Sequence, residues 1–272
     1  MARASRLYVF KVSHFCEKAA WACDHKRLAY EEVVLVPGPH RLTVRRLAPR
    51  SHVPVLVHEG RAIQNSSAII DHLDAVLPDA PLTPRAADER ERALAWEREL
   101  DRELGEAARR VFYWYVLEQP RFLEAEYSRG APFWAPWFFA LALPGVMRAL
   151  RRMYDVTLAE VERDRARLAA LFARLDRELG ARRYLVGDAF SRADLTLAAL
   201  AAPLLRPAGH PVQWADEGAY PPGWIEATRP FAESVTAARV RELYRLHRPA
   251  PFALAPAARA WGLGSRRVAR SG

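Results

Sequence analysis

The first 78 residues combine short strand-like runs with helical patterns. The runs Leu7–Val12 and Tyr30–Val36 are rich in β-branched and aromatic residues, which favours strands. Between them, apolar residues recur at helical spacing from Phe15 to Lys26. A right-handed crossover through this helix makes the two strands parallel. The pattern therefore predicts a β-α-β unit at the start of the chain.

A hairpin and a capped helix follow this unit. A strand-like run begins at Val55, turns at Glu59-Gly60, and returns through the next few residues. The segment after it begins with Asn65 and Ser66, either of which is a suitable N-cap, and continues with apolar residues on one side. The sequence thus predicts a complete small α/β arrangement by residue 78.

Beyond the proline-bounded segment Pro78–Pro84, long amphipathic patterns predict only helices. These patterns cover residues 85–118, 157–179, 191–205 and 222–246. We therefore expect an α/β domain over residues 1–78, a linker over 79–84, an all-α domain over 85–248, and a basic tail rich in proline and alanine over 249–272.

The composition is that of an ordinary globular protein, with 51% hydrophobic and 27% charged residues. Two cysteines in 272 residues do not form a disulfide framework. The N-terminus turns directly into a strand-like run and lacks the long apolar region of a signal peptide. We expect a cytoplasmic protein.

The formal net charge of +9 comes mainly from arginine. Most arginines alternate with acidic residues along predicted helices, which favours solvated helix faces over an acidic partner, and we expect no nucleic acid. Two stretches have arginines without acids: the segment from Arg41 to Arg50, and the tail from Arg248. We expect the tail to be solvated.

Ser13 and Cys16 stand where the first strand gives way to the first helix. The Ser13 hydroxyl can donate to a bound anion such as a thiolate, where the helix dipole stabilises the same charge, or it can simply cap the helix. Cys16 is either a nucleophile activated by the dipole or a packed core residue. Cys23 lies roughly 10 Å further along the helix, beyond disulfide reach, and we expect it in the core.

Two further segments suggest a binding site. A proline at the start of a strand cannot donate to the sheet, so Val53-Pro54 predicts either a cis bond or a trans proline at a sheet edge. A cis bond would leave the Val53 backbone free to pair with an extended peptide ligand. The helix that begins near Asn65 and Ser66 offers free amides and a hydroxyl, which can hold a carboxylate or serve only as a cap.

Together these segments resemble the cytosolic glutathione transferase family. The resemblance rests on four stretches that occur in the family's order: "SHFCEKAAWACD", "LAPRSHVPVL", "NSSAII" and "YLVGDAFSRADLTLAAL". In the last, Ser191 and Asp194 match a capping box that nucleates a buried helix. The S-H-F-C-E-K form also resembles a bacterial branch of the family. The resemblance implies an α/β thioredoxin-like N-terminal domain followed by an all-α C-terminal helical domain.

The resemblance also implies a role for each matching residue. Ser13 would activate the thiolate of glutathione as co-substrate, and Cys16 would match the second cysteine of the glutaredoxin C-x-x-C pattern. No metal is implied.

The same resemblance implies a binding site for the tripeptide. His52 would contact the glycyl carboxylate, and Val53, before cis-Pro54, would pair with the cysteinyl backbone. Asn65 and Ser66 would bind the γ-glutamyl group, although the family prefers an acid or glutamine where Asn65 stands.

The electrophile should lie in an apolar pocket between the domains. We expect its walls to include Phe15, Tyr113, Trp114, Trp134 and Trp137. The aromatic stretch that holds the last two is too short to span a bilayer, which needs ~20 apolar residues. A peripheral membrane contact is the weaker alternative to a pocket wall, core or dimer surface.

The sequence thus predicts a glutathione transferase that conjugates or otherwise activates the glutathione thiolate against an apolar electrophile. The family implies a detoxification role and a homodimer. Two alternatives stay open: a glutathione-dependent thiol-disulfide reductase that uses Cys16, and a non-catalytic binding module with the same fold.

Overall fold

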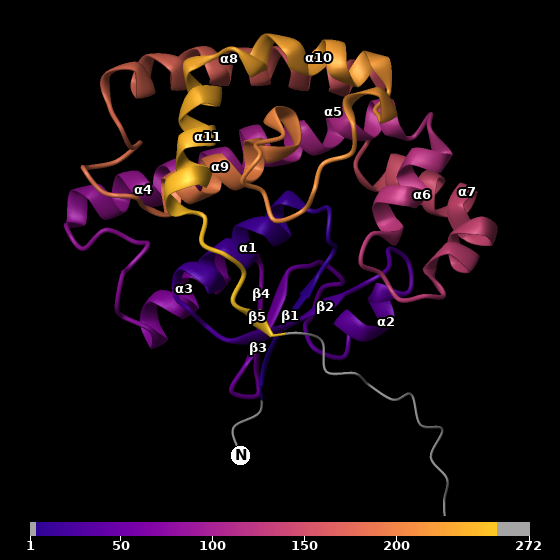
Figure 1. The fold of residues 1–272 in the computed structure, drawn as a ribbon, viewed down its shortest axis with the longest axis horizontal. Coiled ribbons are helices and arrows are strands. Elements are labelled where there is room, and N and C mark those ends of the chain that lie inside the picture. Colours follow the sequence, from indigo (N-terminus) through magenta and orange to yellow (C-terminus); the bar gives the residue numbers. More distant parts are fainter. Residues whose placement is uncertain (1–3, 255–272) are drawn as a thin grey trace, which may run out of the picture.

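A mixed five-stranded sheet lies beneath a larger body of helices (Figure 1). The computed structural model describes residues 4–254. The strands have the spatial order β4-β3-β1-β2-β5. Their bounds are β1 Ser5–Val9, β2 Tyr30–Val34, β3 Val55–His58, β4 Arg61–Gln64 and β5 Ala253–Leu254.

The N-terminal domain confirms the predicted β-α-β unit and hairpin. Strands β1 and β2 are parallel, and β3 is antiparallel to both β1 and β4. The helices of this domain are α1 His14–His25, α2 His40–Val44 and α3 Ser66–Val76. Helix α1 packs against α3 on one side and against the helical domain on the other, which explains why nearly all its residues are buried.

The C-terminal domain is all-helical, as predicted. Its α-helices are α4 Ala87–Leu100, α5 Ala107–Val116, α6 Pro120–Ser128, α7 Ala135–Met153, α8 Leu158–Ala181, α9 Arg192–Leu205, α10 Pro222–Ala232 and α11 Val235–His247. Helix α9 is buried on nearly all sides, as expected for a central helix, and is mostly apolar apart from polar residues in its first turns. The predicted capping box is present, because the Asp194 carboxylate accepts from the N–H of Ser191 and the Ser191 hydroxyl oxygen accepts from the N–H of Asp194.

Several helix boundaries differ from the sequence prediction. The pattern over 85–118 is continuous but contains a π-helical segment at Asp101–Glu106, and the pattern over 222–246 breaks where Ser234 caps α11. Helices α6 and α7 were not predicted, because prolines interrupt their sequence. Pro120 occupies the first turn of α6, where no N–H is needed, while Pro144 lies on the exposed side of α7.

The prediction of a solvated tail is wrong at Arg248, whereas residues 250–252 are exposed. The side chain of Arg248 is 2% exposed and pairs with Glu17 at 2.7 Å and Asp24 at 2.8 Å, both on α1. The chain then adds β5 alongside β2, in parallel, with Ala253 opposite Tyr30 (Figure 1). The C-terminal segment thus returns to the N-terminal domain. Residues 255–272 lie outside the described part of the chain.

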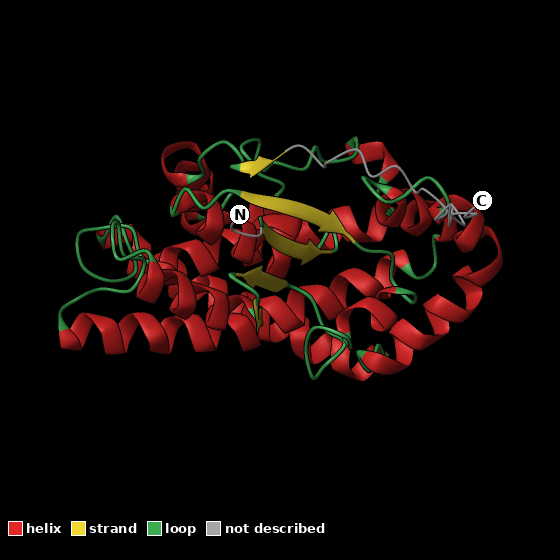
Figure 2. Ribbon diagram, turned by 90° about the horizontal axis from the view of Figure 1, so that it is seen from below, coloured by secondary structure: helices red, strands yellow, loops and turns green. Residues whose placement is uncertain are grey.

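From below, the strands cross the middle of the molecule and helices extend beyond them on both sides (Figure 2). None of the helices formed by residues 4–254 is long and apolar enough to cross a bilayer. The two domains share one core cluster, which runs from Leu7 through α1 and α9 to Tyr244.

Candidate functional site

The register of the sheet brings three chain segments to one of its edges. Strands β1 and β3 are antiparallel with Tyr8 opposite Val55, so the end of β1 lies beside the start of β3. The last residue of β4, Gln64, also pairs with Val55. The residues that follow β1, precede β3 and follow β4 therefore meet at this edge.

The predicted cis bond is present at this edge. The Val53-Pro54 peptide is cis, and Val53 is half-buried. The carbonyl of Pro54 accepts from the N–H of Asn65 at 3.2 Å, which ties the start of β3 to the start of α3. Ser13 follows β1 at the same end, as the resemblance required.

Ser13 is the N-cap residue of α1, but its side chain makes no capping hydrogen bond. Its backbone carbonyl accepts from the N–H groups of Cys16 and Glu17, each at 2.9 Å. The hydroxyl is half-buried at the positive end of the helix dipole. Plain capping therefore does not account for this serine, whose hydroxyl contacts the buried thiol of Cys16.

Cys16 is a core residue rather than an exposed nucleophile. Its side chain is 3% exposed, and burial raises the pKa of its thiol to about 12, although the Ser13 hydroxyl opposes this shift. At neutral pH the thiol is therefore protonated, and only the thiolate is a good nucleophile. Cys23 is fully buried, as predicted, and the two cysteines form no disulfide with each other.

The loop before β3 is held by side chains that the sequence did not single out. The Gln64 amide donates to the carbonyls of Arg50 at 2.7 Å and His52 at 2.8 Å. A ring nitrogen of His40 lies 3.0 Å from the carbonyl of Ser51. The His52 side chain itself is exposed, so it is free to meet a ligand at this edge.

Asn65, rather than Ser66, caps α3. Its backbone has a φ of 89°, a left-handed conformation that asparagine tolerates better than most residues. Its side-chain carbonyl accepts from the Ser67 N–H at 2.8 Å. Ser66 is 2% exposed, so its hydroxyl lies beneath the surface of the site. The Asn65 carbonyl is thus engaged, and only its NH₂ group remains for a ligand.

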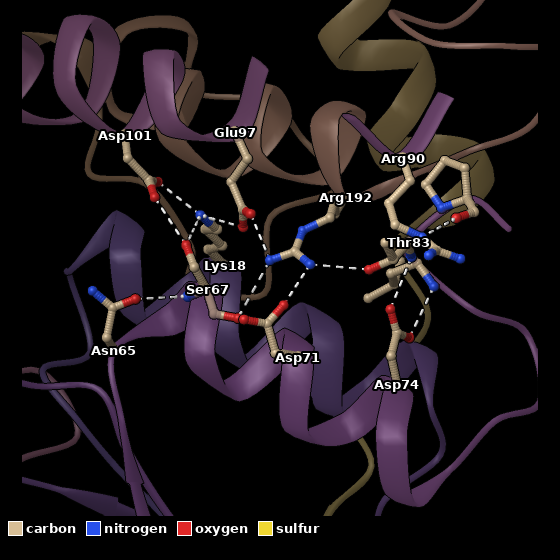
Figure 3. Close-up of polar contacts among 12 residues, drawn as sticks. Lys18, Asn65, Ser67, Asp71, Asp74, Thr83, Arg90, Glu97, Asp101 and Arg192 are labelled. Carbon is tan, nitrogen blue, oxygen red and sulfur yellow. Dashed lines mark hydrogen bonds and ion pairs between the residues drawn. The ribbon is translucent and has the colours of Figure 1, made fainter. Parts of the chain in front are cut away.

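A buried ion-pair network anchors the start of α3 to the helical domain (Figure 3). The Lys18 ammonium lies 3.0 Å from the Ser67 hydroxyl, 2.7 Å from Asp101 and 2.9 Å from Glu97. The Ser67 hydroxyl in turn donates to Asp101 at 2.9 Å. Lys18 is completely buried and Glu97 is nearly so, which makes the geometry of this network costly to disturb.

Arg192 extends the network to the buried helix α9. Its guanidinium pairs with Glu97 at 2.5 Å and Asp71 at 2.6 Å, and donates to the Thr83 hydroxyl at 3.0 Å. Arg192 directly follows the N-cap residue Ser191, so the capping box also positions this cation. The sequence did not predict the network, although a lysine and an arginine inside apolar helical stretches were its visible signal.

Phe15 from the N-terminal domain packs against the helical domain, and Tyr113 stacks on another aromatic side chain within the helical domain. Phe15 packs tightly on the π-helical segment that precedes α5. A Cβ added at Gly105 in this segment would lie 2.6 Å from the Phe15 ring. Tyr113 stacks on Tyr154 with centroids 5.2 Å apart, and its hydroxyl lies 2.6 Å from that of Tyr127. Of the predicted pocket residues, Phe15 and Tyr113 are therefore half-buried against neighbouring aromatic groups.

The tryptophans predicted for the same pocket lie differently. Trp114 and Trp134 are half-buried, and Trp134 packs on Phe138. Phe138 also lies against Gly38, so α7 covers the loop before α2. Trp137, however, is 77% exposed on the outer side of α7, because the inward side carries Phe138 and its neighbours. Trp137 is not the wall of an enclosed pocket.

Other surface features do not coincide with this edge of the sheet. Two hollows of about 410 and 400 Å³ open elsewhere, and neither is lined by Ser13, Val53 or Asn65. The arginines between Arg41 and Arg50 are exposed, as a solvated loop would be. Residues 4–254 bring no group of three metal-ligating His, Cys, Asp or Glu side chains together.

The arrangement defines a class of fold: a thioredoxin-like domain with a cis-proline before β3, joined to an all-helical domain. Family models confirm this class. Residues 7–81 match the glutathione S-transferase N-terminal domain, and residues 159–226 match the glutathione S-transferase C-terminal domain. The chain belongs to the glutathione S-transferase family. A search of curated protein sequences found no match.

Solved structures support the same fold at low sequence identity. A glutathione S-transferase from Rhodospirillum rubrum F11 is 20% identical, with a TM-score of 0.59 over 91% of this chain and 89% of that one. The β-etherase LigF from Sphingobium sp. strain SYK-6 is also 20% identical, with a TM-score of 0.59 over 88% and 99%. A theta class enzyme from Xanthomonas axonopodis pv. citri, solved with glutathione bound, is 21% identical, with a TM-score of 0.56 over 92% and 99%.

Proposed function

We propose that this protein is a glutathione transferase in which the Ser13 hydroxyl stabilises the thiolate of bound glutathione. The observation that carries the proposal is the Ser13 side chain, which stands at the positive end of α1 without a capping bond. Membership of the family supports glutathione as co-substrate, as does the similar Xanthomonas structure with glutathione bound.

The tripeptide would lie along the edge where β1, β3 and α3 meet. The exposed His52 would contact the glycyl carboxylate, and the Val53 backbone beside Pro54 would pair with the cysteinyl residue. At the start of α3, free helix amides and the Asn65 NH₂ would donate to the γ-glutamyl carboxylate. Because the Asn65 carbonyl is engaged by Ser67, it would not accept from the γ-glutamyl ammonium.

The reaction is an attack of the thiolate on an apolar electrophile. The thiol loses its proton to solvent, and the sulfur forms a bond to the electrophilic carbon. In a displacement the leaving group departs with the electron pair of its bond, and in an addition the neighbouring atom takes up a proton. The Ser13 hydrogen bond and the helix dipole would lower the thiol pKa, and binding would position the two reactants.

Ser13→Ala tests this mechanism, with Ser13→Thr as the control that keeps a hydroxyl. A hydrogen bond to a charged group contributes about 1.5–3 kcal/mol, so we expect kcat/KM for conjugation of chlorodinitrobenzene to fall roughly 10- to 100-fold in Ser13→Ala. The ultraviolet absorbance of bound thiolate should fall with it. Wild-type activity and thiolate absorbance in Ser13→Ala would refute the proposed role.

The two alternatives predict different results. If the protein is a reductase that uses Cys16, Cys16→Ala should abolish reduction of a small disulfide, while Ser13→Ala should not. The burial of the Cys16 side chain makes this alternative less favourable than the transferase. A binding module predicts neither conjugation nor retention on immobilised glutathione. One of the similar structures is a β-etherase, so the fold alone does not determine the reaction.

The family also leads us to propose a cytoplasmic homodimer with a role in detoxification. Sedimentation equilibrium of the full chain tests the dimer directly. A single species with the 30.8 kDa mass of one chain at all concentrations would contradict it.

A further inference from the structure

Among residues 4–254, Arg109 has no ion-pair partner and lies over the rings of Phe15 and Tyr154. It lies in the first turn of α5 and is half-buried. Its guanidinium carbon is 4.3 Å from the ring centroid of Tyr154 and 5.6 Å from that of Phe15. The two rings hold the guanidinium in place by cation–π contacts, but its N–H groups form no hydrogen bond with either residue.

No anion neutralises Arg109 within residues 4–254. It takes part in none of the ion pairs or hydrogen bonds of this region, and its Nε is buried without a partner. The next residue is a useful contrast, because Arg110 pairs with Asp164 and donates to the carbonyl of Tyr154 at 2.7 Å. Other arginines with an unpaired buried Nε, such as Arg192, still pair with a carboxylate through the rest of the guanidinium, whereas Arg109 has no carboxylate partner among the described residues.

The titratable groups that face Arg109 are neutral at neutral pH. Burial, and then the charge of Arg109, lower the pKa of His14 to about 3, so His14 is uncharged. Burial raises the pKa of the Tyr113 and Tyr127 hydroxyls, so neither becomes a phenolate. Since no carboxylate of residues 4–254 pairs with Arg109 either, its positive charge has no counter-charge in this part of the chain.

The position of Arg109 associates it with the electrophile rather than with glutathione. Arg109 comes from the helical domain and contacts Phe15, which lies two residues after Ser13. The tripeptide carboxylates are proposed to lie on the opposite side, near His52 and at the start of α3. The rings of Phe15, Tyr113 and Tyr154 offer apolar surface next to the guanidinium.

We propose that Arg109 binds a carboxylate of the electrophile, so that the preferred substrates are aromatic or other apolar electrophiles that carry a carboxylate. This inference rests on the proposed function. A carboxylate fits because the planar guanidinium can donate two parallel hydrogen bonds to its two oxygens. The apolar body of the substrate would pack on the aromatic rings, which places its reactive carbon toward the thiolate.

The test compares an activated chlorodinitrobenzoate with its methyl ester, which keeps the reactive ring but lacks the negative charge. In both, the thiolate sulfur bonds to the ring carbon and chloride leaves with the electron pair. We expect the ratio of kcat/KM for acid over ester to fall roughly 10- to 100-fold in Arg109→Gln, because a charge-assisted hydrogen bond is lost. Comparing ratios between proteins cancels the different intrinsic reactivity of acid and ester. KM for glutathione should change little.

Two further variants sharpen the test. Arg109→Lys keeps the charge but not the paired donors, and we expect an intermediate ratio, which also guards against a folding defect in Arg109→Gln. Arg148→Gln removes one positive charge from an exposed position on α7 and should leave the acid-over-ester ratio unchanged. An equal fall in Arg148→Gln would assign the preference to overall charge and overturn the proposal. An acid-over-ester ratio in Arg109→Gln equal to that of the wild type would overturn it as well.

Calorimetry separates failure of this inference from failure of the proposed function. If neither chloro compound is conjugated, the transferase activity fails, and the titration of unreactive dinitrobenzoate then decides. Tighter binding to the wild type than to Arg109→Gln supports a carboxylate site at Arg109. Equal binding, or none to either protein, refutes it.

Discussion

His14 shows how a single residue at the site acquires its properties from its surroundings. It follows Ser13, is 7% exposed, and has a ring nitrogen 3.0 Å from the carbonyl of Gly105 in the helical domain. Burial and the charge of Arg109 lower its pKa to about 3. A neutral histidine thus joins the start of α1 to the π-helical segment, and its hydrogen bond requires the ring nitrogen to carry the proton.

This burial predicts a loss of stability in acid. The unfolded chain takes up a proton at His14 below its ordinary pKa of 6.5, whereas the folded chain resists until about pH 3. The contribution of the neutral His14 to the free energy of unfolding is therefore fully present above pH 6.5. It is lost as the pH falls toward 3. Between pH 7 and pH 5 we expect the free energy of unfolding to fall by about 2 kcal/mol more in the wild type than in His14→Gln. Denaturant titrations at both pH values measure this, and equal falls in the two proteins would contradict it.

At the scale of elements, the packing of helices determines which charged side chains of the helical domain form buried ion pairs. Helix α11 ends at His247, and the next residue, Arg248, reaches back to α1 and pairs with Glu17 and Asp24. Trp21 reinforces this return, because its indole N–H donates to the carbonyl of His247 at 2.9 Å. The short strand β5 then extends the sheet, so the last described segment fastens the helical domain to the N-terminal one.

Arg248→Ala should therefore be strongly destabilising. It would leave Glu17 and Asp24, both nearly or fully buried, without their cation, and breaking a buried pair costs about 3–5 kcal/mol. Denaturant unfolding measures the loss. Arg245→Ala is the matched control, because Arg245 is exposed in the last turn of α11, and surface substitutions usually change stability by less than about 0.5 kcal/mol. A similar small effect in both variants would show that the return of the chain contributes little.

Across the whole molecule, the two domains share a core and a buried charge network. Helix α1 packs on α9, and Lys18, Glu97 and Arg192 connect α1, α4 and α9 through nearly inaccessible ion pairs. Neither domain could be separated without exposing these charges unpaired. The start of α3, where the γ-glutamyl group is proposed to bind, is fixed by the same network through Ser67.

We therefore expect the two domains to unfold together. Both cysteines lie in the N-terminal domain and are buried, so their reaction with a thiol reagent reports its unfolding. All tryptophans except Trp21 lie beyond residue 85, so fluorescence reports mainly the helical domain. The two probes should give the same denaturant midpoint, as a cooperative transition requires. Separate midpoints would mean that the network does not couple the domains.

Local sequence patterns were sufficient for the order and type of most elements. The strands around Leu7 and Val55, the helix start at Asn65 and the capping box at Ser191 all depend on neighbouring residues, so periodicity and capping chemistry predict them. The cis bond before Pro54 was also visible in the sequence. Helices α6 and α7 were missed, because prolines are compatible with a helix only at positions that the fold decides.

The tertiary structure alone decided which side chains are buried, paired or left without a partner. Cys16 became a core residue and Trp137 a surface residue, although both looked suitable for the site. Arg109 and Arg110 are identical neighbours in the sequence, yet only Arg110 meets an acid. The physical reason is that burial and ion pairing depend on residues far apart in the chain. Local sequence patterns predict the helices and strands but not which of their side chains come into contact.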